Sequence, residues 1–172
     1  TPDNIQFLVN WVTNLGAEKG SLTPREMNAI ENWVYEILKL EKKDRTFAAA
    51  SEIIESLEYN AGETTLKDRF SKWMPDFEDP SKSPIHSMYF NSSKDALAFE
   101  KQIVCFEMGG MLQNNPDMIA PVFSYIYHTF MQTIKNDPCP HIVFIDELKG
   151  YLQNPIAAEF IEGMILKIRK LG

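Results

Sequence analysis

With 172 residues, 44% of them hydrophobic, the chain can bury a sizeable core as one domain or two small ones. The formal net charge is −7 and no basic stripe is present, so direct binding of nucleic acid is not expected. Two cysteines are too few for a disulfide framework, which favours a reducing, cytoplasmic compartment. No run of about eighteen apolar residues predicts a membrane span.

The N-terminal part carries helical periodicity. Apolar residues recur every three or four positions over 3–15, which predicts an amphipathic helix. A second helix is predicted to begin after Thr23, because Pro24 suits the first helical position and Glu26 completes a capping box. The same spacing continues over 47–57.

A shorter helical pattern over 66–74 ends at Pro75, and the next residues are polar and rich in proline. We therefore expect an all-helical subdomain over residues 1–83 and a second domain over residues 84–172. The chain starts without Met and its last helical pattern reaches the chain end, so we expect it to be part of a larger protein.

In the second domain the pattern alternates between continuous apolar runs and helical spacing. The predicted order is a short strand at 87–90, then strand, helix, strand and helix over 102–106, 121–135, 141–147 and 154–168. Strands that alternate with helices are typical of a parallel sheet. The predicted fold class is α/β, with part of a doubly wound sheet following a helical module.

Asp146 and Glu147 are the main candidates for chemistry. They follow the apolar run 142–145, and the carboxyl ends of parallel strands are where such sheets bind ligands. An apolar strand ending in two acids is the pattern of a Walker B motif. Asp146 would hold Mg²⁺ through its water shell, and Glu147 would orient the water that attacks the γ-phosphate of ATP.

The same pattern has a simpler explanation, in which both acids cap the next loop or are solvated. The chain also lacks the Gly-x-x-x-x-Gly-Lys-Ser/Thr loop that wraps phosphates. The segment Gly16 to Gly20 has a similar composition but lies between two predicted helices, which indicates a helix–helix turn. ATP and Mg²⁺ are therefore expected as cofactors of the larger protein and not of this chain alone.

Glu107 follows the other predicted strand and precedes Gly109 and Gly110, which allow a tight turn near a ligand. It could line the same crevice as Asp146, or it could be solvated or ion-paired. Cys139-Pro140-His141 indicates a turn better than a metal site, because no second ligand pair completes a tetrahedron. The three tryptophans lie on helical faces, which favours core or interface positions: Trp11, Trp33 and Trp73.

From residue 102 onward, the order of motifs resembles the ATPases of type IV secretion and conjugal-transfer systems, the TrbE/CagE family. The resemblance lies in Phe106 to Gly109 followed by Leu112, in Ala120-Pro121-Val122 with Tyr125 and His128, in the Walker B run Ile142 to Glu147, and in the closing pair Arg169-Lys170. Upstream, Thr23 with Glu26 and the pattern Leu66, Phe70 and Trp73 are similar to a helical insertion of that family.

This resemblance implies a RecA-like P-loop motor at the cytoplasmic face of the bacterial inner membrane. Its partners would be other secretion subunits and further copies of itself, and ATP hydrolysis would drive substrate transfer or pilus assembly. Arg169 and Lys170 would then contribute to nucleotide binding, although cations at a helix C-terminus also suit the helix dipole alone. The alternative hypothesis is a non-catalytic module that binds partner proteins.

Overall fold

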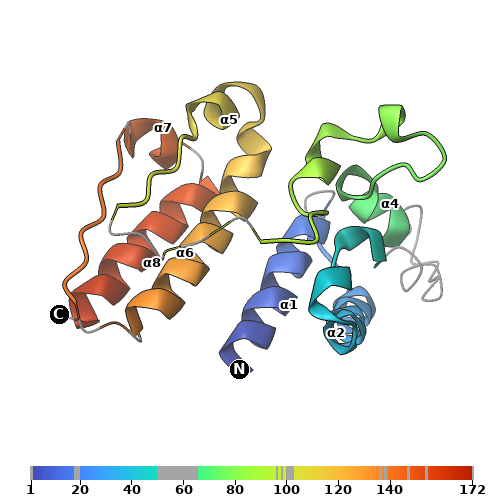
Figure 1. Ribbon diagram of the computed structural model, residues 1–172, viewed down its shortest axis with the longest axis horizontal. Helices are drawn as coiled ribbons and strands as arrows, with labels where there is room; N and C mark the ends of the chain where they lie inside the picture. The colour runs from blue at the N-terminus through green and yellow to red at the C-terminus, as the bar shows by residue number, and fades with distance from the viewer. Residues whose placement is uncertain are drawn as a thin grey trace. The chain divides into compact units, whose positions relative to one another are not determined.

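The structure is a computed structural model that describes residues 2–17, 20–49, 66–95, 97, 99, 103–135, 137, 139–146, 148–153 and 155–171. All regular elements in these residues are helices (Figure 1). The chain divides into two compact units, residues Thr1–Asp95 and Ala96–Gly172.

The first unit contains the helices that the periodicity predicts. These are α1 (Pro2–Ala17), α2 (Pro24–Lys39), α4 (Leu66–Phe70) and the 3₁₀ turns η1 (Lys42–Asp44), η2 (Ser71–Trp73), η3 (Pro80–Lys82) and η4 (Ile85–Met88). The predicted helix over 47–57 is helical at 47–49, and its remainder lies outside the described residues. The linker between α1 and α2 contains Gly20, whose φ of 114° suits glycine.

The predicted capping box at the start of α2 is confirmed. The Thr23 hydroxyl accepts a hydrogen bond from the Glu26 backbone N–H at 3.3 Å, and the Thr23 backbone N–H donates to Glu26 Oε2 at 2.7 Å. These bonds satisfy two donors that the first turn of a helix otherwise leaves unpaired. The sequence therefore determines where α2 begins.

An aromatic cluster forms the core of the first unit, and the core positions predicted for the three tryptophans are confirmed. Trp33 lies 5.1 Å from Phe70 and 5.4 Å from Phe47 between ring centroids, both edge-on. Trp11 lies 4.7 Å from Phe90 in the same way. Edge-on contacts pair the positive ring edge with the negative ring face, which stabilises the cluster beyond its buried area.

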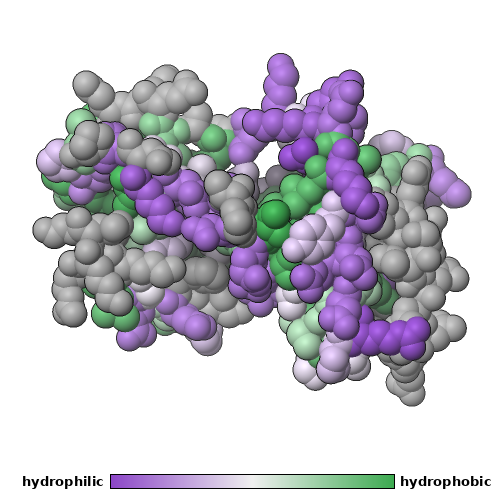
Figure 2. Space-filling view, turned by 90° about the horizontal axis from the view of Figure 1, so that it is seen from below, coloured by the Kyte–Doolittle hydropathy of each residue, from purple (hydrophilic) through white to green (hydrophobic). Residues whose placement is uncertain are grey.

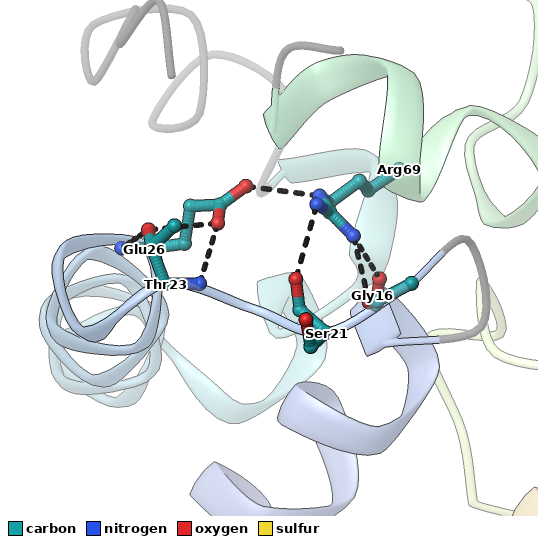
Figure 3. A network of polar contacts seen from close by, with 6 residues as sticks. Gly16, Ser21, Thr23, Glu26 and Arg69 are labelled. Atoms are coloured by element: carbon teal, nitrogen blue, oxygen red, sulfur yellow. Dashed lines mark hydrogen bonds and ion pairs between the residues drawn. The ribbon is translucent and has the colours of Figure 1, made fainter. Parts of the chain in front are cut away.

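A buried ion pair joins α4 to the first turn of α2 (Figure 3). Arg69 Nε donates to Glu26 Oε1 at 2.9 Å, and the two side chains are only 10% and 2% exposed. The other guanidinium nitrogens donate to the carbonyl oxygens of Gly16, Gly20 and Ser21. Burial alone would raise the pKa of Glu26, but the Thr23 hydrogen bonds and the Arg69 charge together lower it.

The boundary between the units lies at residues 95 and 96, whereas the sequence analysis placed it at 83 and 84. The segment after residue 84 packs on the first unit. Phe90 lies 5.8 Å from Trp73, and the Asn91 side chain accepts from the Ala48 N–H at 2.7 Å and donates to the Trp73 carbonyl at 3.1 Å. Polar composition alone did not indicate these contacts.

The second unit is built on two long helices that lie side by side, α6 (Ile119–Lys135) and α8 (Pro155–Leu171) (Figure 1). Shorter elements complete it: α5 (Gly109–Asn114), η5 (Pro116–Met118) and α7 (Leu148–Leu152). The helices predicted over 121–135 and 154–168 are confirmed. Their core contains buried Ile119, Tyr127, Ala157, Ile161 and Met164.

The predicted α/β fold with a partial RecA-like parallel sheet is wrong, because the described residues contain no strand. Residues 87–90 belong to η4 and the turn after it. Residues 103–108 and 140–145 lie outside any helix, and no β-ladder joins them within the described part of the chain. The apolar runs therefore do not form the buried strands that their composition predicted.

Large apolar side chains of these non-helical segments are exposed instead. Ile103 is 82% exposed, Ile142 77% and Phe144 90%. Figure 2 shows one face of the molecule, on which hydrophobic residues lie between hydrophilic ones. Exposed apolar side chains grouped on two neighbouring segments are characteristic of surfaces that contact another partner.

Candidate functional site

Glu107 and Asp146 each end a non-helical segment and precede a helix. Glu107 precedes α5 with Met108 between them, and Asp146 lies in the turn before α7. Both residues are exposed. Although 39 positions separate them in sequence (146 − 107), the side chains of both segments line one depression of about 1420 Å³.

This depression combines apolar walls with carboxylates at its surface. Its walls come from the two non-helical segments and from α6, and they include several aromatic rings: Phe99, Phe106, Phe123, Tyr127, Phe130 and Phe144. Its acidic residues are Glu107, Asp137 and Asp146, and no lysine or arginine is among the described lining residues. A phosphate-containing ligand would therefore need cations from elsewhere to offset these charges.

The Glu107 carboxylate is fixed by the backbone that follows it. Its Oε1 accepts a hydrogen bond from the Gly109 N–H at 2.6 Å, at the start of α5. A Cβ atom at position 109 would lie 2.8 Å from that oxygen, so a larger residue there would require the Glu107 side chain to shift. Gly109 and Gly110, which were predicted to allow a tight turn after a strand, instead form the first residues of α5.

The other predicted site residues are only partly described. Glu147 lies outside the described residues. Arg169 and Lys170 lie in the last turn of α8, and their side chains are likewise outside the described part. Among the described residues, the depression brings together Glu107 and Asp146 of the predicted set.

A polar cluster that the sequence analysis did not identify lies on the loop after α6. Asp137 Oδ1 accepts from the Cys139 N–H at 3.0 Å, and Asp137 Oδ2 lies 3.3 Å from His141 Nε2. The hydrogen bonds from Cys139, then the His141 charge, lower the pKa of Asp137, and the carboxylate in turn raises the pKa of the Cys139 thiol. The Asp-x-Cys-x-His spacing in the sequence could have indicated this polar cluster.

The cluster supports the predicted turn at Cys139-Pro140-His141. Within the described residues, no group of three or more histidine, cysteine or acidic side chains is placed to hold a metal ion. Cys105 and Cys139 are both exposed free thiols that line the depression. Both thiols are therefore accessible to alkylating reagents.

Replacing Asp137 with asparagine is expected to speed alkylation of Cys139 by about two- to tenfold at a pH of about 8. The substitution removes the negative charge that disfavours the thiolate, and the thiolate is the reacting form. Mass spectrometry after timed iodoacetamide treatment measures the rate. Cys105 serves as the internal reference, and an unchanged ratio of the two rates would contradict the assigned interaction.

Comparison of the chain with protein-family models, with curated proteins and with solved structures gave no match. Among the described helices, none is long and apolar enough to cross a membrane. The functional conclusion therefore depends on the residues of the site and on the order of the motifs.

Proposed function

We propose that this chain contributes the acidic part of the ATP-hydrolysing site of a type IV secretion or conjugal-transfer ATPase. The observation that carries the proposal is the shared depression of Glu107 and Asp146, the two acids that follow apolar segments in the motif order described above. The proposal concerns these residues and does not depend on a sheet.

In this proposal Asp146 holds the hydrated Mg²⁺ of MgATP, and Glu147 orients the attacking water. Carboxylate oxygens at the rim of an open depression suit a hydrated Mg²⁺, which binds proteins through one or two carboxylates and keeps several waters. The bound ion would neutralise charge on the transferred phosphoryl group. Glu107, fixed by the Gly109 N–H, adds a second oriented acceptor on the same depression.

The 172 residues contain no Gly-x-x-x-x-Gly-Lys-Ser/Thr loop, and the described lining of the depression supplies no lysine or arginine. The phosphates must therefore be held by another part of the ATPase. We infer that the chain alone does not hydrolyse ATP appreciably, because positioning of the phosphates supplies much of the catalysis. The parent ATPase would act at the cytoplasmic face of the bacterial inner membrane, with other secretion subunits as partners.

In the ATPase that contains this chain, Asp146→Asn is expected to raise the Mg²⁺ concentration for half-maximal turnover by about 10- to 100-fold. The substitution removes the charge that attracts the hydrated ion but keeps the side-chain size. A phosphate-release assay over a Mg²⁺ titration measures the effect. The matched control is Glu159→Gln on α8, an exposed acid, and equal Mg²⁺ profiles for both variants would contradict the role of Asp146.

The second candidate function is a non-catalytic module that binds partner proteins. The exposed apolar side chains Ile103, Ile142 and Phe144 favour it. Two measurements separate the two functions. If the chain is a binding module, truncation of Ile103, Ile142 and Phe144 lowers its affinity for the partner protein. The Mg²⁺ dependence of ATP turnover is then the same in Asp146→Asn as in the wild type.

A further inference from the structure

The segment 141–146 leads into the turn at Asp146, and among the described residues no β-ladder fixes its position. In the described part of the chain, the backbone hydrogen bonds of the loops and turns do not engage residues 142–145. In a β-sheet, ladder hydrogen bonds and alternate burial of side chains set which residue faces the core. Here the register must be set by other contacts.

Within this segment burial begins only at Ile145, because Val143 is 43% exposed and lies at the surface like its neighbours. Ile145 packs against both core clusters of the second unit, while Phe144 is 90% and Ile142 77% exposed. A shift of the chain by one residue would place Phe144 where Ile145 now packs and would displace Asp146 by about 3.3 Å along the segment. Because phenylalanine is the larger apolar side chain, burial alone does not favour the observed register.

A polar contact at the other end of the segment opposes this slip. His141 Nε2 lies 3.3 Å from Asp137 Oδ2, and the His141 ring meets Phe130 of α6 edge-on with centroids 6.1 Å apart. Asp137 is itself fixed, because its N–H donates to the Ile134 carbonyl at 3.3 Å and its other carboxylate oxygen accepts from Cys139. Pro140 restricts the backbone between the two partners.

We infer that the Asp137–His141 pair sets the register of segment 141–146, and that His141 is thereby a positioning residue for Asp146. The inference rests on the proposed function only for its consequence in catalysis. The register itself is a property of the second unit and can be measured without ATP.

Methyl NMR of the 172-residue chain tests the register. In the wild type, the Ile145 methyl groups should show contacts to the methyl groups of Met131 and Met164, which share the core cluster that Ile145 packs against. In His141→Ala these contacts should lose at least about half of their intensity, and contacts from the Phe144 ring should replace them. In His141→Gln, whose amide can still donate to Asp137, the wild-type pattern should return.

Unchanged Ile145 contacts in His141→Ala would overturn the inference. If that variant unfolded the second unit, the contacts within α6 and α8 would also disappear. Asp137→Ala, which removes the acceptor and leaves the histidine, would then decide, and it should show the same exchange of Phe144 for Ile145.

Turnover by the full ATPase separates this inference from the proposed function. If the register determines the position of the Asp146 carboxylate, His141→Ala should lower ATP turnover by about tenfold, because small misplacements of a catalytic group are costly. His141→Gln should restore most of the turnover. If His141→Ala shows the exchange of NMR contacts but Asp146→Asn has normal ATP turnover, the proposed function is refuted and the inference about the register stands. Normal turnover in His141→Ala beside a defective Asp146→Asn would refute the positioning role.

Discussion

Replacing Arg69 with alanine is expected to lower the free energy of unfolding of the first unit by about 3–5 kcal/mol. The substitution leaves the Glu26 carboxylate 2% exposed without its charged partner, and it also removes the donors to the carbonyl oxygens of Gly16, Gly20 and Ser21. Urea unfolding followed by tryptophan fluorescence measures the change, because all three tryptophans lie in this unit.

A matched arginine provides the control for this prediction. Arg45 makes an exposed hydrogen bond to the Leu40 carbonyl at 3.0 Å, so Arg45→Ala should cost no more than about 1 kcal/mol. The double variant Arg69→Ala with Glu26→Gln should recover part of the loss, because the unpaired buried charge is then absent. Equal effects of Arg69→Ala and Arg45→Ala would show that the buried network does not stabilise the fold as described.

The second large effect is expected for Phe70→Ala, at about 3–5 kcal/mol. Phe70 is 0% exposed and contacts Trp33 and Phe47, and its ring lies 2.9 Å from where a Cβ atom on Gly16 would be. Truncation removes these contacts and leaves a cavity where α1, α2 and α4 converge. The same fluorescence-detected unfolding measures the loss.

Phe77 offers the matched control, since it is the same residue type and is 63% exposed. Phe77→Ala should change the free energy of unfolding by no more than about 0.5 kcal/mol, as is usual for surface positions. If both variants lost similar stability, the aromatic cluster would not be the core of the first unit.

Local sequence features were sufficient to predict the helices of the first unit. The capping box of Thr23 and Glu26 and the spacing of apolar residues in α1 involve neighbours within a few positions, so they can be identified in a single sequence. The ion pair of Glu26 with Arg69 could not be predicted, because 43 positions separate the two residues and only tertiary packing brings them together.

The prediction of a sheet failed for a related reason. The apolar run Ile142 to Ile145 predicts a strand, but a strand requires neighbouring chain with which to form hydrogen bonds, and the structure has no β-ladder at this run. A single sequence does not show whether such a neighbour is present. The shared depression of Glu107 and Asp146 likewise depends on how the loops after two separate segments pack on α6 and α8.

The most direct test of the proposed ATPase site is the turnover of Glu147→Gln in the ATPase that contains this chain. Glutamine keeps the size of the side chain but cannot act as the carboxylate that orients the attacking water. We predict that kcat falls by about 10²- to 10⁴-fold while ATP binding is retained, with Glu159→Gln unchanged. Turnover of Glu147→Gln equal to that of the wild type would contradict the proposed function.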